Sequence, residues 1–145
     1  MAKPRVLFLC TGNSARSQMA EAFLRRYAGD RFEVFSAGLE PKGINPYTYQ
    51  VMEDRGFDLS QHSSKDLKLF LGKISFAYLI TVCDNAEERC PFFPGAGIRL
   101  HWSFEDPAAY PGSAEEKLAK FRQVRDQIDA RIRTWLKSIG IMVRF

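Results

Sequence analysis

Two short, almost entirely apolar runs place the strongest constraint on the fold. Val6–Cys10 is wholly apolar, and Phe76–Cys83 is apolar except for Thr81. Runs of this length without polar alternation are typical of strands that are buried on both faces. Such strands are found mainly in parallel sheets, where a crossover helix connects one strand to the next and helices cover the sheet.

Helical patterns alternate with the apolar runs. Four segments show helical spacing or helix caps, and they begin after Arg16, at Pro46, after Ser64 and near Leu118. Glycines are placed to end the first three: Gly29, Gly56 and Gly72. Two further strand candidates are Phe32–Ala37 and Ile98–Trp102. The alternation predicts a single α/β domain over residues 1–145, with a parallel sheet that helices cover on both faces.

Composition and charge exclude several classes of protein. With 21 basic and 17 acidic residues the net charge is +4, and no block of five or more like charges occurs, so we expect no nucleic-acid partner. No apolar run approaches the roughly 18 residues of a membrane span, so we expect no membrane association and no secretory signal. Three cysteines are too few for a disulfide framework, and their odd number indicates a reducing compartment. We expect a cytoplasmic monomer.

A C-x5-R-S motif follows the first apolar run and precedes the first helical segment. After Cys10 it contains Thr11, Gly12, Asn13, Ser14, Ala15, Arg16 and Ser17. In this position the loop amides and the helix N-terminus can surround one tetrahedral oxyanion, and Arg16 can bind two of its oxygens. The alternative is an ordinary buried cysteine before a turn, and the strand-loop-helix setting favours the oxyanion site.

The position of Cys10 before a helix also indicates that it is a nucleophile. The helix N-terminus and Arg16 are predicted to lower the pKa of the Cys10 thiol, and Ser17 Oγ can donate a hydrogen bond to the sulfur. Cys83 also ends a predicted strand, so both thiols should reach the carboxyl edge of the sheet, where parallel sheets bind ligands. Asn13 is expected to adopt a left-handed backbone conformation, which asparagine tolerates better than most residues.

Motifs along nearly the whole chain resemble the low-molecular-weight protein tyrosine phosphatase family, and beyond it the thioredoxin-coupled arsenate reductase branch. The matching motifs occur in the family's order: Cys10–Glu21, Ser36–Gly38, Gly43–Pro46, Asp58–Ser63, Thr81–Cys83, Cys90–Pro91, His101–Trp102 and Asp106–Pro107. The resemblance implies the family's fold, a four-stranded parallel sheet with helices on both faces. It also implies an enzyme that reduces arsenate to arsenite in arsenic detoxification, with phosphate and sulfate as competing oxyanions.

The resemblance assigns a redox role to all three cysteines. Cys10 would attack arsenate to give a covalent arsenic adduct, and Cys83 would then attack Cys10, releasing arsenite and leaving a Cys10–Cys83 disulfide. Cys90 would next attack Cys83, and thioredoxin, reduced ultimately by NADPH, would reduce the resulting disulfide. No tightly bound cofactor is implied. Asp106, followed by Pro107, matches the family's general acid.

Two other functions stay open on sequence alone. The first is a low-molecular-weight phosphatase; against it, Ala108-Ala109-Tyr110 lacks the adjacent tyrosine pair that such phosphatases often carry. Weak phosphatase activity is still expected, because the oxyanion site is shared. The second is a non-enzymatic protein that senses oxyanions or arsenic, and the combination of nucleophile, arginine, acid and two further thiols argues against it.

Good helix formers occupy residues 84–89, between Cys83 and Cys90. Residues seven apart in a helix are about 10.5 Å apart along its axis, whereas a disulfide needs Cα atoms within about 7 Å. We therefore expect this segment to unwind when Cys83 and Cys90 join.

Pro91–Pro94 is either a docking patch for thioredoxin or part of the core, and the sequence does not distinguish the two.

Some family members bind potassium near the loop, and the resemblance places four residues in that site: Asn13, Glu21, Ser36 and Asp66. The pattern departs at Lys65, which stands where an aspartate is usual, and Asp66 matches only with a one-residue shift. This departure favours a structural polar network over an ion site.

His62 and His101 have no cysteine, histidine or carboxylate at zinc-ligand spacing, so we expect no transition metal and structural roles for both.

Overall fold

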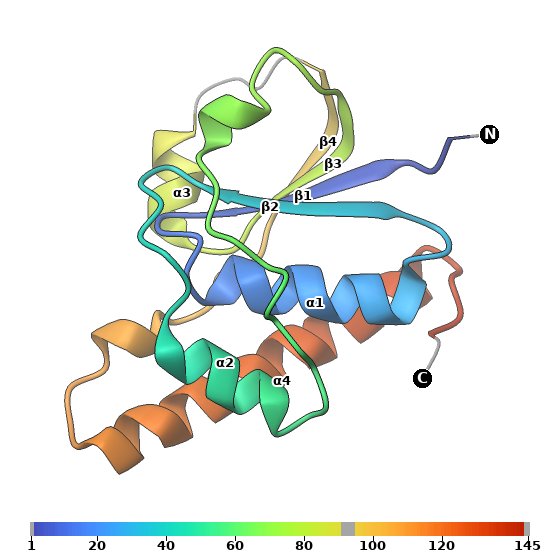
Figure 1. Cartoon of the computed structure of the whole chain (residues 1–145). Coiled ribbons are helices and arrows are strands. Elements are labelled where there is room, and N and C mark those ends of the chain that lie inside the picture. Colours follow the sequence, from blue (N-terminus) through green and yellow to red (C-terminus); the bar gives the residue numbers. More distant parts are fainter. Residues whose placement is uncertain (1, 91–94, 144–145) are drawn as a thin grey trace.

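Four strands pair into one parallel sheet in the order β2-β1-β3-β4 (Figure 1). They are β1 (Arg5–Cys10), β2 (Glu33–Gly38), β3 (Phe76–Thr81) and β4 (Ala96–His101). The computed structural model describes residues 2–90 and 95–143. The predicted fold class, a four-stranded parallel sheet flanked by helices, is confirmed.

β1 owes its apolar sequence to its central position. Leu7 pairs with Phe35 of β2 on one side and with Leu79 of β3 on the other. Because neighbouring strands flank β1 and helices cover the sheet, the side chains on both of its faces are buried. β4, at the edge, is largely exposed, and Ile98 keeps 49% of its surface in contact with solvent.

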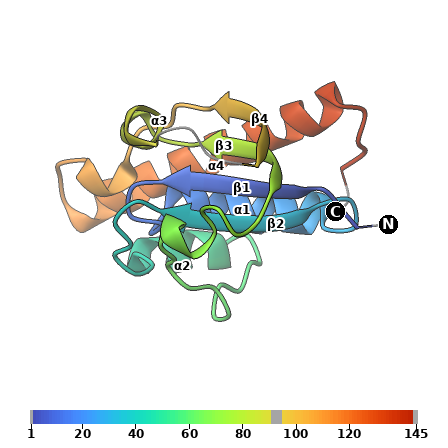
Figure 2. The same cartoon turned by 90° about the horizontal axis from the view of Figure 1, so that it is seen from above.

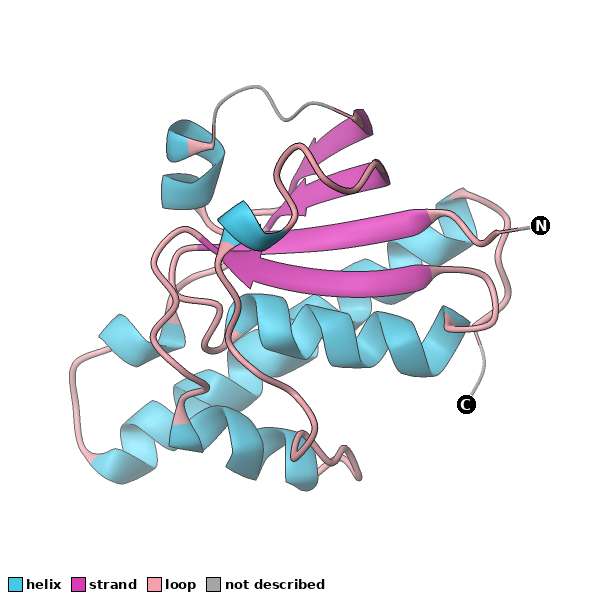
Figure 3. Ribbon diagram, turned by 45° about the horizontal axis from the view of Figure 1, so that its top comes forward, coloured by secondary structure: helices cyan, strands magenta, loops and turns pink. Residues whose placement is uncertain are grey.

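Helices lie on both faces of the sheet, but unequally (Figures 1 and 3). Three helices lie on the side of one face: α1 (Arg16–Ala28), α4 (Ala114–Ser138) and α2 (Pro46–Glu53), which packs against α4. The other carries the short helix α3 (Asp84–Arg89) and the 3-10 helix η1 (Leu67–Leu69). Figure 2 shows α3 beside the carboxyl ends of β1 and β3. Among the described residues, none of the helices combines the length and hydrophobicity of a membrane span.

Local hydrogen bonds explain where the elements differ from the predicted ones. The helix predicted after Ser64 is wrong: only η1 forms, Asp66 caps it, and Ser64 Oγ donates to the carbonyl of Gly12 instead. β3 ends at Thr81 rather than at Cys83, because Cys83 caps α3. The bounds of β2 and β4 differ from the predicted strands by one or two residues, whereas α1, α2 and α4 form where helices are predicted.

An ion cluster around Asp129 joins α1 to α4. Tyr27 OH donates to Asp129 Oδ1 over 2.7 Å, and the guanidinium groups of Arg55 and Arg133 each donate to the carboxylate over 2.9 Å. Burial raises the pKa of Asp129, but these hydrogen bonds outweigh it and hold the pKa below its ordinary value. The cluster therefore stabilises the fold at pH values above the unfolded pKa of Asp129, and this stability is lost as the pH falls through the lowered folded value.

Asp129→Asn is expected to lower the free energy of unfolding by about 2 kcal/mol at neutral pH, because an amide cannot accept charge-assisted hydrogen bonds from two arginines. Urea unfolding followed by circular dichroism measures the change. Asp126→Asn is the matched control, because that carboxylate is 57% exposed to solvent in its pairs with Arg55 and Arg125 and should contribute less than about 1 kcal/mol. Equal losses in the two variants would contradict the assigned role of Asp129.

Candidate active site

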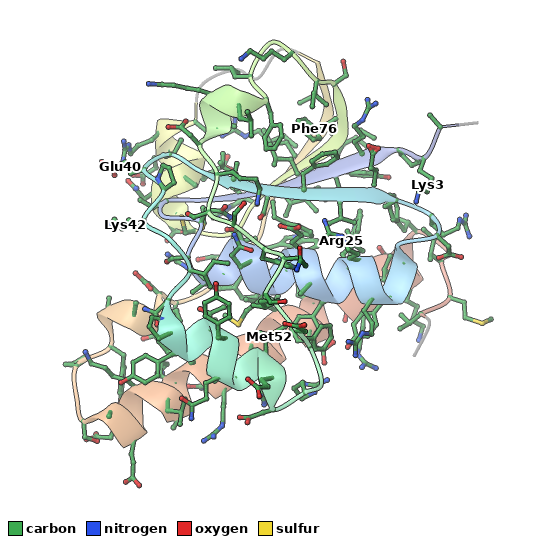
Figure 4. The ribbon with its side chains drawn as sticks, in the orientation of Figure 1. Lys3, Arg25, Glu40, Lys42, Met52 and Phe76 are labelled. Atoms are coloured by element: carbon green, nitrogen blue, oxygen red, sulfur yellow. The ribbon has the colours of Figure 1, made fainter. Side chains whose placement is uncertain are left out.

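The predicted oxyanion loop lines a cleft of about 920 Å³ at the carboxyl edge of the sheet. Besides the loop, residues 42–46, 83–85 and 103–106 contribute to the cleft, together with Ala108. Cys10 and Cys83 both line it, as their positions near strand ends predict. Figure 4 marks Glu40 and Lys42 on the loop that follows β2, at the end of the sheet where α3 also lies.

Asn13 organises the loop. It is buried and adopts the predicted left-handed conformation, with φ of 48°. Its backbone amide donates to Cys10 Sγ over 3.2 Å. Its side-chain Nδ2 donates to Ser17 Oγ over 2.7 Å and to Ser36 Oγ over 3.0 Å. One residue therefore contacts the sulfur directly and also positions the hydroxyl beside it.

The orientation of the Asn13 amide sets the direction of the hydrogen bond between Ser17 and Cys10. Asn13 Oδ1 accepts from Lys65 N over 2.8 Å and from Gln18 Nε2 over 3.0 Å, so Nδ2 faces Ser17. Ser17 Oγ accepts from Asn13, which leaves its own hydrogen for Cys10 Sγ, 2.8 Å away. Donation in this direction favours the thiolate over the thiol.

The predicted lowering of the Cys10 pKa is wrong in direction. Cys10 is 3% exposed, and burial raises the pKa of its thiol. Hydrogen bonds from Ser17 and the positive charge of Arg16 oppose this rise without overcoming it, and the neighbouring Cys83 adds to it. The prediction counted donors and charges but not desolvation, which disfavours the charged form of a buried group.

Arg16 and Asp106 lie together on the cleft. Arg16 Nη1 donates to the carbonyl of Phe104 over 3.0 Å, and Nη2 lies 3.7 Å from Asp106 Oδ2. Asp106 Oδ1 accepts from Ala108 N and so caps the 3-10 helix η2 (Pro107–Ala109). The structure thus places Asp106, the predicted general acid, beside Arg16, the residue predicted to bind the oxyanion.

Cys83 is buried at the N-terminus of α3 and contacts the oxyanion loop. Its Sγ accepts a hydrogen bond from Ala86 N over 3.4 Å and thereby caps the helix. Thr11 Oγ1 lies 3.4 Å from the same sulfur. Because Asn85 Nδ2 donates to Thr11 Oγ1 over 2.8 Å, the hydroxyl hydrogen of Thr11 is left for Cys83.

Cys90 lies at the other end of α3, buried and outside the set of described residues that line the cleft. The helix between the two cysteines forms as predicted, and it separates them by about 10 Å along its axis. Burial raises the pKa of the Cys90 thiol, while the charge of Arg99 lowers it and that of Glu87 raises it. All three cysteines are free thiols, and the structure brings together Cys10 and Cys83 but not Cys90.

Three of the four residues that the resemblance assigns to potassium meet in the structure, and the fourth does not. Ser36 Oγ donates to the carboxylate of Glu21, and Asn13 Nδ2 donates to Ser36 Oγ. Asp66 instead accepts from Lys68 N at the start of η1. Asp66 therefore takes no part in the hydrogen bonds that join the other three residues.

The cluster does not fit a potassium ion. Arg25 Nη2 lies 2.6 Å from one carboxylate oxygen of Glu21, and Lys65 Nζ lies 3.9 Å from the other. Asn13 turns its NH₂ group, not its oxygen, toward Ser36. Hard cations need oxygen ligands, and here protein cations and N–H donors face the available oxygens. Hydrogen bonds and ion pairs within the protein thus already engage the oxygens of this cluster.

His62 and His101 both have hydrogen-bond partners. Burial lowers the pKa of His62, whose Nδ1 lies 3.0 Å from Gln18 Oε1. His101 Nδ1 lies 2.8 Å from Thr81 Oγ1, and its Nε2 lies 2.9 Å from Asp84 Oδ1. Within residues 2–90 and 95–143, no group of three or more histidine, cysteine, aspartate or glutamate residues could hold a metal ion.

Sequence reasoning missed Lys42 and the steric role of Gly38. Lys42 lines the cleft, and its backbone N donates to the carbonyl of Gly12 over 3.0 Å, so a cationic residue lies beside the oxyanion loop. A Cβ on Gly38 would lie 2.7 Å from Thr11 O and 2.8 Å from Asn13 N, so only glycine allows β2 to approach the loop this closely. Lys42 carried no local signal, because it is distant from the loop in sequence.

The model of the low molecular weight phosphotyrosine protein phosphatase family matches residues 5–143. The chain belongs to this family. It is 43% identical to an arsenate reductase of Halalkalibacterium halodurans over 139 residues, which cover 95% of this chain and 99% of that protein. It resembles a solved arsenate reductase in the phosphate binding state with a TM-score of 0.79 and 30% identity, over 94% of this chain and 99% of that one. A thioredoxin-dependent arsenate reductase of Corynebacterium glutamicum matches with a TM-score of 0.70 and 33% identity, over 94% of this chain and 62% of that one.

In this family member, Ser17→Ala is expected to raise the pKa of the Cys10 thiol further, because the hydrogen bond from the Ser17 hydroxyl lowers it. The rate of Cys10 alkylation by iodoacetamide, measured against pH in a Cys83→Ser, Cys90→Ser background, should shift to higher pH. Ser14→Ala is the matched control, since the hydrogen bonds to Cys10 come from Ser17 and Asn13 and not from the Ser14 hydroxyl. Identical profiles for Ser17→Ala and its parent would show that this hydroxyl does not stabilise the thiolate.

Proposed function

We propose that this protein is an arsenate reductase that uses three thiols in sequence and thioredoxin as its reductant. The observation that carries the proposal is that Cys83 shares the cleft with Cys10 and contacts Thr11 of the oxyanion loop. A phosphatase needs one thiol and water, whereas reduction of arsenate to arsenite takes two electrons, which two thiols supply by forming a disulfide. The arsenate reductases named above, one of them thioredoxin-dependent, support the assignment.

The first step forms a bond between sulfur and arsenic. Arsenate binds to the loop amides and to Arg16, as a tetrahedral oxyanion does at such a loop. Cys10 Sγ attacks arsenic, and one arsenate oxygen leaves as water with a proton from Asp106. Because burial opposes the Cys10 thiolate, the hydrogen bonds from Ser17 and from the Asn13 amide stabilise it as it forms.

The second step transfers two electrons to arsenic. Cys83 attacks Cys10 Sγ, the S–S bond forms, and the S–As bond breaks. The electron pair of that bond stays on arsenic, so arsenic(V) becomes arsenic(III) and leaves as arsenite. Thr11 and the amide of Ala86 both contact the Cys83 sulfur and hold it beside the oxyanion loop for this attack.

The third step passes the disulfide outward. Cys90 attacks Cys83, and Cys10 leaves as a thiolate ready for another arsenate. Because a helical α3 holds the two cysteines too far apart for a disulfide, α3 unwinds in this step. The dithiol of thioredoxin reduces the Cys83–Cys90 disulfide, with NADPH as the ultimate electron source and no tightly bound cofactor. The predicted docking patch Pro91–Pro94 lies outside the described residues.

The second candidate function is that of a low-molecular-weight phosphatase, which the family match and the shared oxyanion loop favour. Cys10, Arg16 and Asp106 would serve it without the other two thiols. The residues Ala108-Ala109-Tyr110 lack the expected tyrosine pair. We propose that phosphate ester hydrolysis is a weak side activity.

We also propose that the protein is a cytoplasmic monomer that acts in arsenic detoxification. Three free thiols that must return to the reduced state after each turnover suit a reducing compartment. Phosphate and sulfate are tetrahedral oxyanions like arsenate, so they should compete for the loop.

Cys83→Ser is expected to abolish arsenate reduction while aryl phosphate hydrolysis continues, because the variant has no second thiol beside Cys10. Cys90→Ser is expected to permit one turnover and to stall as a Cys10–Cys83 disulfide. Rapid quenching with alkylation and mass spectrometry identifies the disulfide, and released arsenite gives the number of turnovers. Repeated turnover by Cys83→Ser would disprove the relay.

Asp106→Asn is expected to lower arsenate turnover about 10²-fold, because an amide cannot give a proton to the leaving oxygen. The pH dependence of turnover should lose the limb that reports this acid. Asp106→Glu is the matched control, since it keeps a carboxyl group and should recover part of the rate. Unchanged turnover and an unchanged pH profile in Asp106→Asn would remove the acid role.

A further inference from the structure

Arg99, on the edge strand β4, contacts three oxygens in the segment that connects Cys83 to Cys90. Its Nη2 donates to the carbonyls of Glu87 and Cys90, each over 3.0 Å. Its Nε lies 3.5 Å from Oε1 of Glu87. One side chain from the sheet therefore binds the last turn of α3 through both backbone and side-chain acceptors.

α3 depends on contacts of this kind because it is short. Its six residues are far fewer than the about 12 at which an isolated helix becomes marginally stable. The last carbonyls of a helix have no partner within it, and a cation at this end supplies one. At the first turn, His101 and Ser103 both contact Asp84 at 2.9 Å. Arg99 and His101 are two residues apart on β4, so they lie on the same face of that strand.

We propose that Arg99 is a positioning residue that keeps α3 helical, and so keeps Cys83 and Cys90 apart, until Cys83 has reacted with Cys10. This inference rests on the proposed three-thiol function. A direct Cys83–Cys90 disulfide, formed by exchange with any oxidised disulfide, would consume both resolving thiols without reducing arsenate. A helical α3 prevents it by distance, about 10 Å along the axis against the limit of about 7 Å between Cα atoms.

The first disulfide of the relay weakens the opposite end of α3. The Cys83 sulfur accepts the hydrogen bond from Ala86 N that caps the helix. In the Cys10–Cys83 disulfide this sulfur is bonded to Cys10, which draws it away from the Ala86 amide and weakens the cap. Arg99 then holds a helix with a weakened N-terminal cap, and unwinding becomes easier only after Cys83 has been used. The clamp thus sets the order of the two disulfides.

A different role for Arg99 predicts the opposite result. Its positive charge lowers the pKa of Cys90 against the effect of burial. If Arg99 acted only by favouring the Cys90 thiolate, its removal would slow the formation of a Cys83–Cys90 disulfide. If it acts as a clamp, its removal speeds that reaction. The sign of the effect therefore separates the two roles.

The test measures formation of the Cys83–Cys90 disulfide without arsenate, in the full chain carrying Cys10→Ser so that two thiols are present. Oxidised glutathione is the oxidant: one protein disulfide forms and two molecules of reduced glutathione are released, followed by alkylation and mass spectrometry. At one fixed pH, Arg99→Gln is expected to form the disulfide about tenfold faster than its parent, the effect of losing the two charge-assisted hydrogen bonds from Nη2, partly offset by the higher pKa of Cys90 without that charge. Amide exchange of residues 84–90 should become faster, while exchange of α1 stays unchanged.

Two further variants complete the test. Arg99→Lys keeps the charge but not the planar guanidinium, whose Nη2 binds both carbonyls while Nε faces Glu87, so its rate should lie between those of the parent and Arg99→Gln. Arg89→Gln removes a charge from α3 itself, where the partner Glu40 is exposed, and should change the rate less than about twofold. An unchanged or slower rate in Arg99→Gln overturns the proposal, as does equal acceleration in Arg89→Gln. Should Arg99→Gln fail to fold, a rate for Arg99→Lys no faster than the parent overturns it.

Because this assay contains no arsenate, its result does not depend on whether the chain reduces arsenate. Failure of the clamp would appear as an unaltered rate of disulfide formation. Failure of the proposed function would appear instead as the absence of arsenate-dependent turnover in the unmutated chain. The two failures are therefore distinguishable.

Discussion

The left-handed backbone of Asn13 is the constraint on which the rest of the site depends. It turns the chain between β1 and α1 so that the Asn13 amide points at Cys10 Sγ, and it places the side chain against Ser17 and Ser36. The amide of Lys65, from a loop distant in sequence, fixes the orientation of that side chain. The hydrogen-bond direction at the nucleophile thus follows from one strained residue and its partners.

The three thiols of the proposed relay occupy three different environments around this loop. Cys10 is buried beneath the loop, where desolvation raises the pKa of its thiol and the hydrogen bonds from Ser17 act in the opposite direction. Cys83 caps α3 and reaches the loop through Thr11. Cys90 lies at the far end of α3, outside the described lining of the cleft. These positions agree with the proposed order of reaction, because Cys83 is the thiol beside Cys10 and α3 must open before Cys90 can follow.

The fold and the cleft could be predicted largely from sequence because local patterns encode them. The apolar run of β1, the Asn45 cap of α2 and the strand-loop-helix setting of Cys10 are each visible within a few residues. Contacts between distant segments carry no such signal, which is why the approach of Lys65 to Asn13 and the binding of α3 by Arg99 were not predicted. The helix expected after Ser64 does not form, because the Ser64 hydroxyl donates to the carbonyl of Gly12 in the oxyanion loop instead of capping a helix.

Oxidation of NADPH that depends on arsenate, measured with the purified protein, thioredoxin and thioredoxin reductase, tests the assignment as an arsenate reductase most directly. Omission of thioredoxin is the control. Sustained oxidation only in the complete mixture, with arsenite formed in equal amount, is the predicted result. No oxidation, together with ready hydrolysis of an aryl phosphate, would contradict the reductase assignment and favour the phosphatase.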